Sequence, residues 1–189
     1  MNNQITLVSG SLAQVSQQKG ITLAESFLDC DVIIMVDTSG SMDTNDSRGG
    51  RTRYDIAVEE LNNLQKSMPG KIAVISFSSS AEFNPAGIAQ YQGCGTDVAG
   101  ALKFVKVADQ IEGMKFILVS DGQPNDEREA LGVARTFKNH ISCIYVGPED
   151  YPSGREFLER LAAASGGKMM TADRAKELAA SVTMLLLNG

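Results

Sequence analysis

The chain has 189 residues, within the usual size of one domain, and 43% of them are hydrophobic while 21% are charged. This composition is typical of a folded globular protein and too apolar for a disordered chain. A formal net charge of −6 and a pI near 4.8 argue against nucleic acid and anionic membranes as main partners, because both require a basic face. No apolar run approaches the roughly 20 residues of a membrane helix, so we expect no membrane span.

The first residues lack the charged start and apolar core of a secretory signal. The cysteines Cys30, Cys94 and Cys143 are odd in number and form no C-x-x-C pair, which favours neither a disulfide framework nor a zinc cluster. We therefore expect a reducing, cytoplasmic location. Residues 1–28 are interpreted as an N-terminal extension with amphipathic stretches at 11–18 and 21–28, which either caps a sheet or forms a mobile arm. Residues 29–189 are expected to form one domain.

Short apolar runs rich in β-branched residues then alternate with longer segments of helical periodicity. The predicted strands are 31–36, 71–77, 115–120, 141–146 and a weaker one at 168–171, and the predicted helices are 54–67, 97–108, 127–139, 155–165 and 172–187. Residues 88–91 alternate apolar and polar and are interpreted as a short edge strand. The alternation predicts an α/β fold, a three-layer α/β/α doubly wound (Rossmann-like) arrangement around a mostly parallel sheet.

Oxygen-bearing side chains follow the first predicted strand at two-residue intervals. Asp37, Ser39 and Ser41 leave one tight loop, with Gly40 between the serines. In open α/β sheets ligands bind at the carboxyl ends of the strands, where strand order reverses. Small hard cations prefer oxygen ligands, so an aspartate and two hydroxyls on one turn favour a divalent metal. The string alone is equally consistent with an ordinary turn.

Two further loops add ligands of the same kind. The loop Gly93–Asp97 offers the hydroxyl of Thr96 before a predicted helix, and Asp121 follows the predicted strand 115–120. Both loops are expected at the same edge of the sheet as Asp37, because they also lie at the carboxyl ends of strands or the amino ends of helices. Three loops are therefore predicted to converge.

These residues resemble the metal-ion-dependent adhesion site of von Willebrand factor A domains. The family pattern D-x-S-x-S is matched by Asp37, Ser39 and Ser41, its threonine by Thr96 and its last aspartate by Asp121, and the similarity spans about residues 31–187. The resemblance implies a vWA-type fold, a Mg²⁺ site in which Mn²⁺ or Ca²⁺ is also possible, and a protein partner that offers an Asp or Glu carboxylate to the metal. It is closest to intracellular, bacterial-type members, which act as adaptors or assembly factors beside MoxR-type AAA+ ATPases. It implies a binding module and not an enzyme.

Two other functions compete with this interpretation. A strand-end aspartate on a parallel sheet also describes Mg²⁺-dependent phosphohydrolases of the haloacid-dehalogenase type, but these need a second acid where this chain has Ser39. No phosphate-binding G-x-x-x-x-G-K-[ST] loop is present, and the only histidine, His140, is interpreted as a surface residue, which argues against Ser-His-Asp catalysis. A third possibility is signalling through a shift of the helix predicted at 172–187.

Several nearby residues have plainer interpretations. The run 43–47 partly resembles a calcium loop but lacks the required glycine and closing glutamate, so a solvated loop is expected. The three arginines that follow this run, at positions 48, 51 and 53, are likewise expected to be exposed to solvent. A weaker alternative is that they select an acidic partner surface. Cys94 is assigned a packing role, Cys143 is expected to be buried, and the acidic and amide residues after Asp121 are assigned to helix capping. The arginines are Arg48, Arg51 and Arg53, and the capping residues are Asn125, Asp126 and Glu129.

Overall fold

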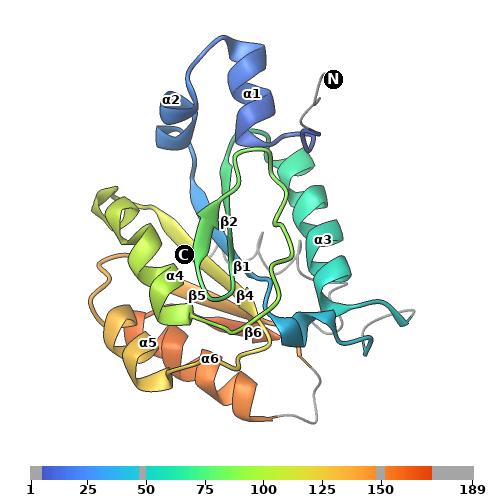
Figure 1. Cartoon of the computed structure of the whole chain (residues 1–189). Coiled ribbons are helices and arrows are strands. Elements are labelled where there is room, and N and C mark those ends of the chain that lie inside the picture. Colours follow the sequence, from blue (N-terminus) through green and yellow to red (C-terminus); the bar gives the residue numbers. More distant parts are fainter. Residues whose placement is uncertain (1–5, 47–49, 148–151, 172–189) are drawn as a thin grey trace.

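The computed structural model describes residues 6–46, 50–147 and 152–171, which form one mixed α/β unit (Figure 1). The helices are α1 (Leu12–Lys19), α2 (Leu23–Leu28), α3 (Arg53–Ser67), α4 (Val98–Val105), α5 (Glu127–Ala134) and α6 (Pro152–Ser165), with 3-10 turns η1 (Gly40–Asp43) and η3 (Lys106–Gln110). The strands are β1 (Val32–Asp37), β2 (Ile72–Phe77), β3 (Ala81–Phe83), β4 (Lys115–Ser120), β5 (Ile141–Tyr145) and β6 (Met169–Thr171). In this part of the chain no helix has the length and apolar character needed to cross a membrane.

The six strands form one sheet in the order β3-β2-β1-β4-β5-β6. All neighbouring pairs are parallel except β2 with β3, which is antiparallel. The first strand therefore lies at the centre, and the chain returns to its other side at β4. This position is the topological switch point at which open α/β sheets bind ligands. Both predicted carboxylates, Asp37 and Asp121, lie at the carboxyl ends of the two strands that flank it.

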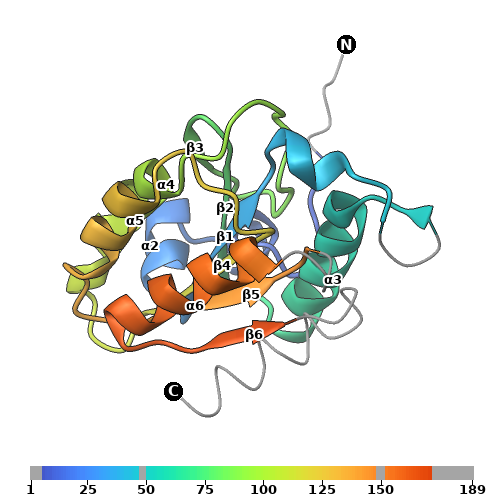
Figure 2. The same ribbon diagram turned by 90° about the horizontal axis from the view of Figure 1, so that it is seen from below.

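Helices cover both faces of the sheet, which gives the predicted three layers (Figure 2). One face packs against α4, α5 and α6, and the other packs against α3. The central strands β1 and β2 are buried along their whole length, because apolar side chains point into both layers. The mostly parallel, doubly wound fold class is confirmed. The helix predicted at 172–187 lies outside the described residues.

The N-terminal segment is hydrogen-bonded to the rest of the molecule. The amides of Val8 and Ala13 donate to the carbonyls of Ala86 and Pro85, both at 2.9 Å, and Gly70 donates to Gly10 at 2.9 Å. Two short helices follow, and α2 begins with a capping box in which Thr22 and Glu25 bind each other's backbone amides. Of the two options for this segment, the described residues 6–28 favour a cap over a mobile arm. The division after residue 28 stays a prediction.

The local predictions needed three corrections. The edge strand exists, but it is β3 and not residues 88–91, because the chain turns back directly after β2 and pairs Ser76 with Glu82. The helix predicted at 127–139 ends at Ala134, where the Thr136 hydroxyl bonds to the carbonyl of Val133 and Phe137 turns into the core. The segment 97–108 is likewise divided, into α4 and η3.

Candidate metal centre

The loop after β1 is fixed in place by its own backbone and by β2. Thr38 donates twice to the carbonyl of Phe77, from its amide at 2.8 Å and from its hydroxyl at 3.0 Å. The amide of Ser39 donates to Asp37 Oδ1 at 2.9 Å, and the hydroxyls of Ser39 and Ser41 lie 3.2 Å apart. Asp37 and Ser39 are buried, whereas Ser41 is partly exposed. The three predicted ligands of this loop therefore form one cluster with Ser41 at its solvent side.

The loop that carries Thr96 lies against the first loop. The amide of Gly40 donates to the carbonyl of Cys94 at 3.2 Å, and the amide of Gly93 donates to the carbonyl of Thr38 at 2.9 Å. Cys94 has a φ of 67°, a left-handed conformation that is rare outside glycine. The side chain of Thr96 is almost fully buried. Strand β1 and the start of α4 thus bring their polar loops together.

The loop after β4 completes the junction. The hydroxyl of Ser120 donates to Asp37 Oδ2 at 2.6 Å and accepts from the amide of Gly122 at 3.0 Å. Asn125 binds the second loop in both directions, because its side-chain oxygen accepts from the Thr96 amide and its own amide donates to the Thr96 carbonyl, both at 2.9 Å. Hydrogen bonds therefore join all three loops at the carboxyl edge of the sheet, which Figure 2 faces.

Two buried carboxylates lie in this junction. The pKa of Asp37 is raised to about 6, first by burial and then by the negative charge of Asp121, while hydrogen bonds from Ser120 and Ser39 act in the opposite direction. Asp121 is 1% exposed, and its Oδ2 accepts a hydrogen bond from Arg53 Nη1 at 2.8 Å. Two like charges in a poorly solvated place repel each other, so a further cation bound between them would reduce this repulsion.

The remaining oxygen of Asp121 tests whether such a cation fits. Asp121 Oδ1 is buried and has no hydrogen-bond partner among the described residues. A buried carboxylate oxygen without a partner is costly, and a metal or a donor would satisfy it. Two carboxylates with three hydroxyls form an oxygen-only donor set, which suits Mg²⁺, Mn²⁺ or Ca²⁺. No group of three or more His, Cys, Asp or Glu side chains within the described residues could hold a metal, so sites rich in thiolate or imidazole are absent there.

The sequence of this region also matches a known family. Residues 32–123, which include all five predicted ligands, match the family model of the von Willebrand factor type A domain. This part of the chain is therefore similar to a von Willebrand factor type A domain. The six-stranded sheet agrees with this family, and the match gives no support to the haloacid-dehalogenase alternative. A comparison with curated protein sequences finds no match.

Solved structures with this fold cover most of the chain. An aerotolerance-related membrane protein from Bacteroides fragilis is 16% identical, covers 85% of this chain and 100% of its own, and gives a TM-score of 0.68. The conserved hypothetical protein BatB from Bacteroides thetaiotaomicron is 16% identical, with coverages of 84% and 98% and a TM-score of 0.60. Manganese-loaded TRAP protein from Plasmodium vivax is 18% identical, with coverages of 84% and 73% and a TM-score of 0.59. At these identities the similarity establishes the fold.

The structure changes the interpretation of several residues near the junction. Arg53, expected to be solvated, is 7% exposed and paired with carboxylates, whereas Arg51 is half-exposed as expected and pairs with Glu59. Arg48 lies outside the described residues. Cys94 does not pack inward but is exposed, because its left-handed turn points its carbonyl toward the neighbouring loop. Asn125 binds the Thr96 loop, while Asp126 caps α5 as predicted.

Other expectations are confirmed. Cys143 is buried, His140 is exposed, and the described residues of the run 43–47 are exposed, although Asp46 among them is paired with Arg53. The sequence analysis did not assign Ser120 or Arg53 to the junction. Ser120 could have been noticed as a polar residue at the end of an apolar strand. Arg53 could have been noticed as a cation in the first turn of a helix, which opposes the helix dipole unless an anion is near.

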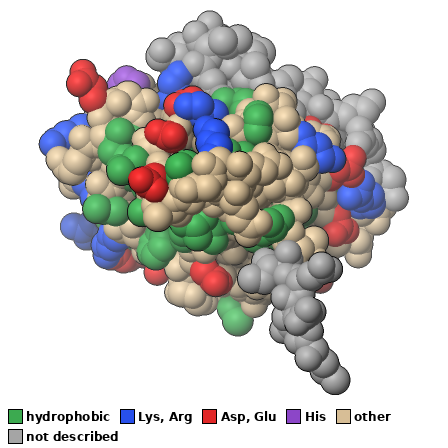
Figure 3. Space-filling model, turned by 90° about the horizontal axis from the view of Figure 1, so that it is seen from above, with side chains coloured by type: hydrophobic (Ala, Val, Ile, Leu, Met, Phe, Trp, Pro, Cys, Tyr) green, Lys and Arg blue, Asp and Glu red, His purple; other side chains and the backbone are tan. Residues whose placement is uncertain are grey.

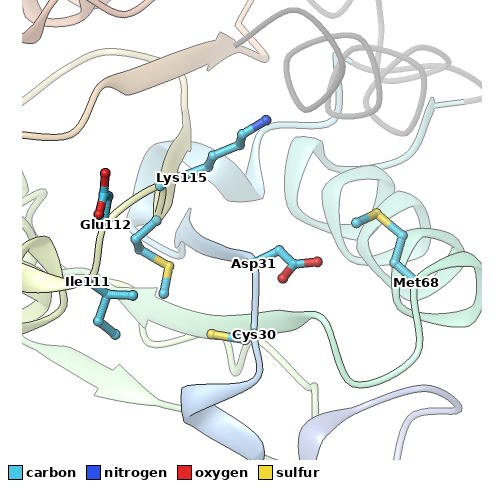
Figure 4. A pocket seen from close by; sticks show the side chains of 8 residues that line it. Cys30, Asp31, Met68, Ile111, Glu112 and Lys115 are labelled. Atoms are coloured by element: carbon cyan, nitrogen blue, oxygen red, sulfur yellow. The ribbon is translucent and has the colours of Figure 1, made fainter.

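Hollows also lie away from this edge, two of them with volumes above 300 Å³. At the amino ends of β1 and β4 a pocket of about 340 Å³ is lined by residues including Cys30, Asp31 and Glu112, but Figure 4 shows the two carboxylates pointing away from each other. An apolar groove of about 600 Å³ lies between α2 and the α4–η3 segment. Hydrophobic side chains also gather in patches on the end of the molecule seen in Figure 3, opposite the candidate centre. Neither hollow contains converging polar groups.

Proposed function

We propose that this von Willebrand factor A-like domain is a metal-dependent protein-binding module, with Mg²⁺ held by Asp37, Ser39, Ser41, Thr96 and Asp121. The observation that carries the proposal is the buried Asp121 Oδ1, which has no hydrogen-bond partner among the described residues and lies at a junction of three loops that also carry hydroxyls. Mn²⁺ and Ca²⁺ suit the same oxygen set and are alternatives. A manganese-loaded relative in fold, the TRAP protein, supports this choice of cation class.

The donor set favours binding over catalysis. A bound divalent cation would supply an open coordination position for an Asp or Glu carboxylate of a partner protein. The three hydroxyls are neutral, so they orient the ion without cancelling its charge. Asp37 accepts hydrogen bonds at both oxygens, which holds it as a fixed ligand and not as a free nucleophile. We therefore propose a non-enzymatic role as an adaptor or assembly factor, with a cytoplasmic MoxR-type AAA+ ATPase system as the candidate partner.

Metal titration tests the site itself. Isothermal titration with Mg²⁺ and Mn²⁺ is expected to give one site per chain, and Thr96→Ala is expected to weaken it by at least about tenfold, since ligand and supporting-shell changes have effects of this size. The control is Thr136→Ala, which removes an exposed hydroxyl bonded only to the Val133 carbonyl at the end of α5. No metal binding, or equal affinity in both variants, contradicts the proposed site.

Partner capture tests the role of the metal. Proteins retained from the native cell on the immobilised domain are expected to be released by chelator and to be absent with Thr96→Ala. Retention of every partner in chelator contradicts a metal bridge. A phosphatase assay tests the alternative. If the protein hydrolyses a phosphomonoester in the presence of Mg²⁺, and Asp37→Ala abolishes this activity, the non-enzymatic role is contradicted.

A further inference from the structure

A buried arginine lies beside the candidate metal centre. Arg53 is the first residue of α3, it is 7% exposed, and its Nη1 lies 2.8 Å from Asp121 Oδ2. Its other nitrogens reach Asp46, with Nε 2.9 Å from Oδ1 and Nη2 2.5 Å from Oδ2. The guanidinium therefore links a buried predicted ligand to an exposed carboxylate of the loop that follows Ser41.

The position of this cation is unfavourable without its partners. The amino end of a helix carries partial positive charge, so a cation in the first turn is repelled, and burial removes its hydration. Two carboxylates offset both effects, and these pairs raise the pKa of Arg53. Arg53 is held there by its ion pairs with Asp46 and Asp121, and the second of these neutralises a buried carboxylate.

The arginine satisfies only half of that carboxylate. Asp121 Oδ2 is paired with Arg53, while Oδ1 has no partner in the described part of the chain. Asp37 lies close enough for its pKa to respond to the charge of Asp121. The junction thus has two buried acids and one internal cation, and a divalent ion held by Asp121 would be a near neighbour of Arg53.

We propose that Arg53 is a resident counter-cation that stabilises the metal-free domain and thereby lowers its affinity for metal. Without metal, Arg53 offsets the charge of Asp121, so its removal destabilises the metal-free state strongly. With metal, Asp121 already has a cation, and Arg53 repels the ion, so its removal affects the metal-bound state less. Metal affinity depends on how much Arg53 stabilises the metal-free domain relative to the metal-bound domain. Because it stabilises the metal-free domain more, metal binding is weaker with Arg53 than without it. The inference rests on the proposed metal site.

Mn²⁺ titration of Arg53→Met tests the sign of the effect. Loss of a unit charge beside a divalent ion is expected to tighten Mn²⁺ binding by at least about tenfold. The melting temperature of this variant in chelator is expected to fall below that of the unsubstituted protein. Arg53→Lys keeps the charge and is expected to bind Mn²⁺ with nearly unchanged affinity. The matched control is Arg51→Met, since Arg51 lies two residues away, is half-exposed and pairs only with groups of α3.

A second variant acts in the opposite direction and keeps the test decisive if Arg53→Met fails to fold. Asp46→Asn removes the exposed partner of Arg53, leaves more positive charge near the metal, and is expected to weaken Mn²⁺ binding about threefold at low salt. If the unsubstituted protein binds Mn²⁺ but Arg53→Met binds it equally or more weakly, or Asp46→Asn binds it more tightly, the counter-cation inference is wrong. If neither the unsubstituted protein nor Arg53→Met binds Mn²⁺, the proposed function is overturned together with it.

Discussion

The replacement Asp37→Asn measures how much the two buried acids of this junction lower the free energy of unfolding. The pKa of Asp37 rises from the ordinary 3.8 to about 6, which corresponds to about 3 kcal/mol against folding once the carboxyl is ionised. Well below pH 3.8 the group is protonated in both states, so it has no effect there. Between pH 3.8 and about 6 the unfolded chain is ionised while the folded chain still holds the proton, so the metal-free protein loses stability across this range and no more above it. Asparagine cannot ionise and lacks this loss.

Urea unfolding in chelator at pH 4, 6 and 8 measures the effect. The free energy of unfolding of Asp37→Asn, relative to the unsubstituted protein, is expected to rise by about 3 kcal/mol between pH 4 and 8. A constant offset of about 1 kcal/mol is expected beneath this trend, since asparagine cannot accept both hydrogen bonds that Asp37 accepts. Excess Mg²⁺ is expected to stabilise only the unsubstituted protein, because a ligand that binds the folded state alone shifts the equilibrium by mass action.

A matched substitution shows whether the trend belongs to burial. Asp43→Asn removes an exposed carboxylate only six residues away, and its stability is expected to track that of the unsubstituted protein at every pH. Parallel pH curves for Asp37→Asn and the unsubstituted protein would refute the reasoning, since they would mean that Asp37 is as well solvated in the folded chain as in the unfolded one.

Three further predictions concern the loops around the centre. Gly122→Ala is expected to destabilise the fold by about 2 kcal/mol or more in thermal melts, because Gly122 has a φ of +77° and an added Cβ lies 2.1 Å from the Gly154 carbonyl oxygen; a melt unchanged from the unsubstituted protein contradicts this placement. Asn125→Ala is expected to weaken Mn²⁺ affinity about tenfold in titrations, since its side chain holds the Thr96 loop. A thiol reagent is expected to modify Cys94 rapidly and the buried Cys143 only after unfolding, and Cys94→Ser should remove the rapid phase.

The fold could be predicted well because its signals are local and repeated. The apolar runs of β1, β2 and β4 are buried on both faces, as their composition indicated. The edge was harder, because a three-residue strand such as β3 depends on pairing with β2 and not on its own pattern. Alternation at residues 88–91 imitated a strand, yet Ala89 is buried and its carbonyl accepts from the Tyr54 hydroxyl at 2.6 Å in a loop.

The candidate centre could be predicted only as a set of ligands. Asp37, Ser39 and Ser41 are adjacent in sequence, and strand order explains why Thr96 and Asp121 approach them. The supporting residues could not be found in this way. Arg53 meets Asp121 across 68 positions of sequence, and Asn125 meets Thr96 across 29, so neither contact has a local pattern. Composition assigned both residues their commonest roles, a solvated cation and a helix cap.

Charge balance connects the fold to the proposed function. The only histidine of the chain, His140, lies before β5 at the opposite edge of the sheet and bonds to the Ser165 carbonyl, so it takes no part in the centre. Besides the carboxylates of Asp37 and Asp121, the groups that surround the centre are hydroxyls, which stay neutral, and Arg53, which stays charged. Neither exchanges protons near neutral pH. Such a shell can hold a cation and present its charge, and the arginine beside it adds positive charge. An incoming carboxylate is the partner group that this arrangement attracts most strongly.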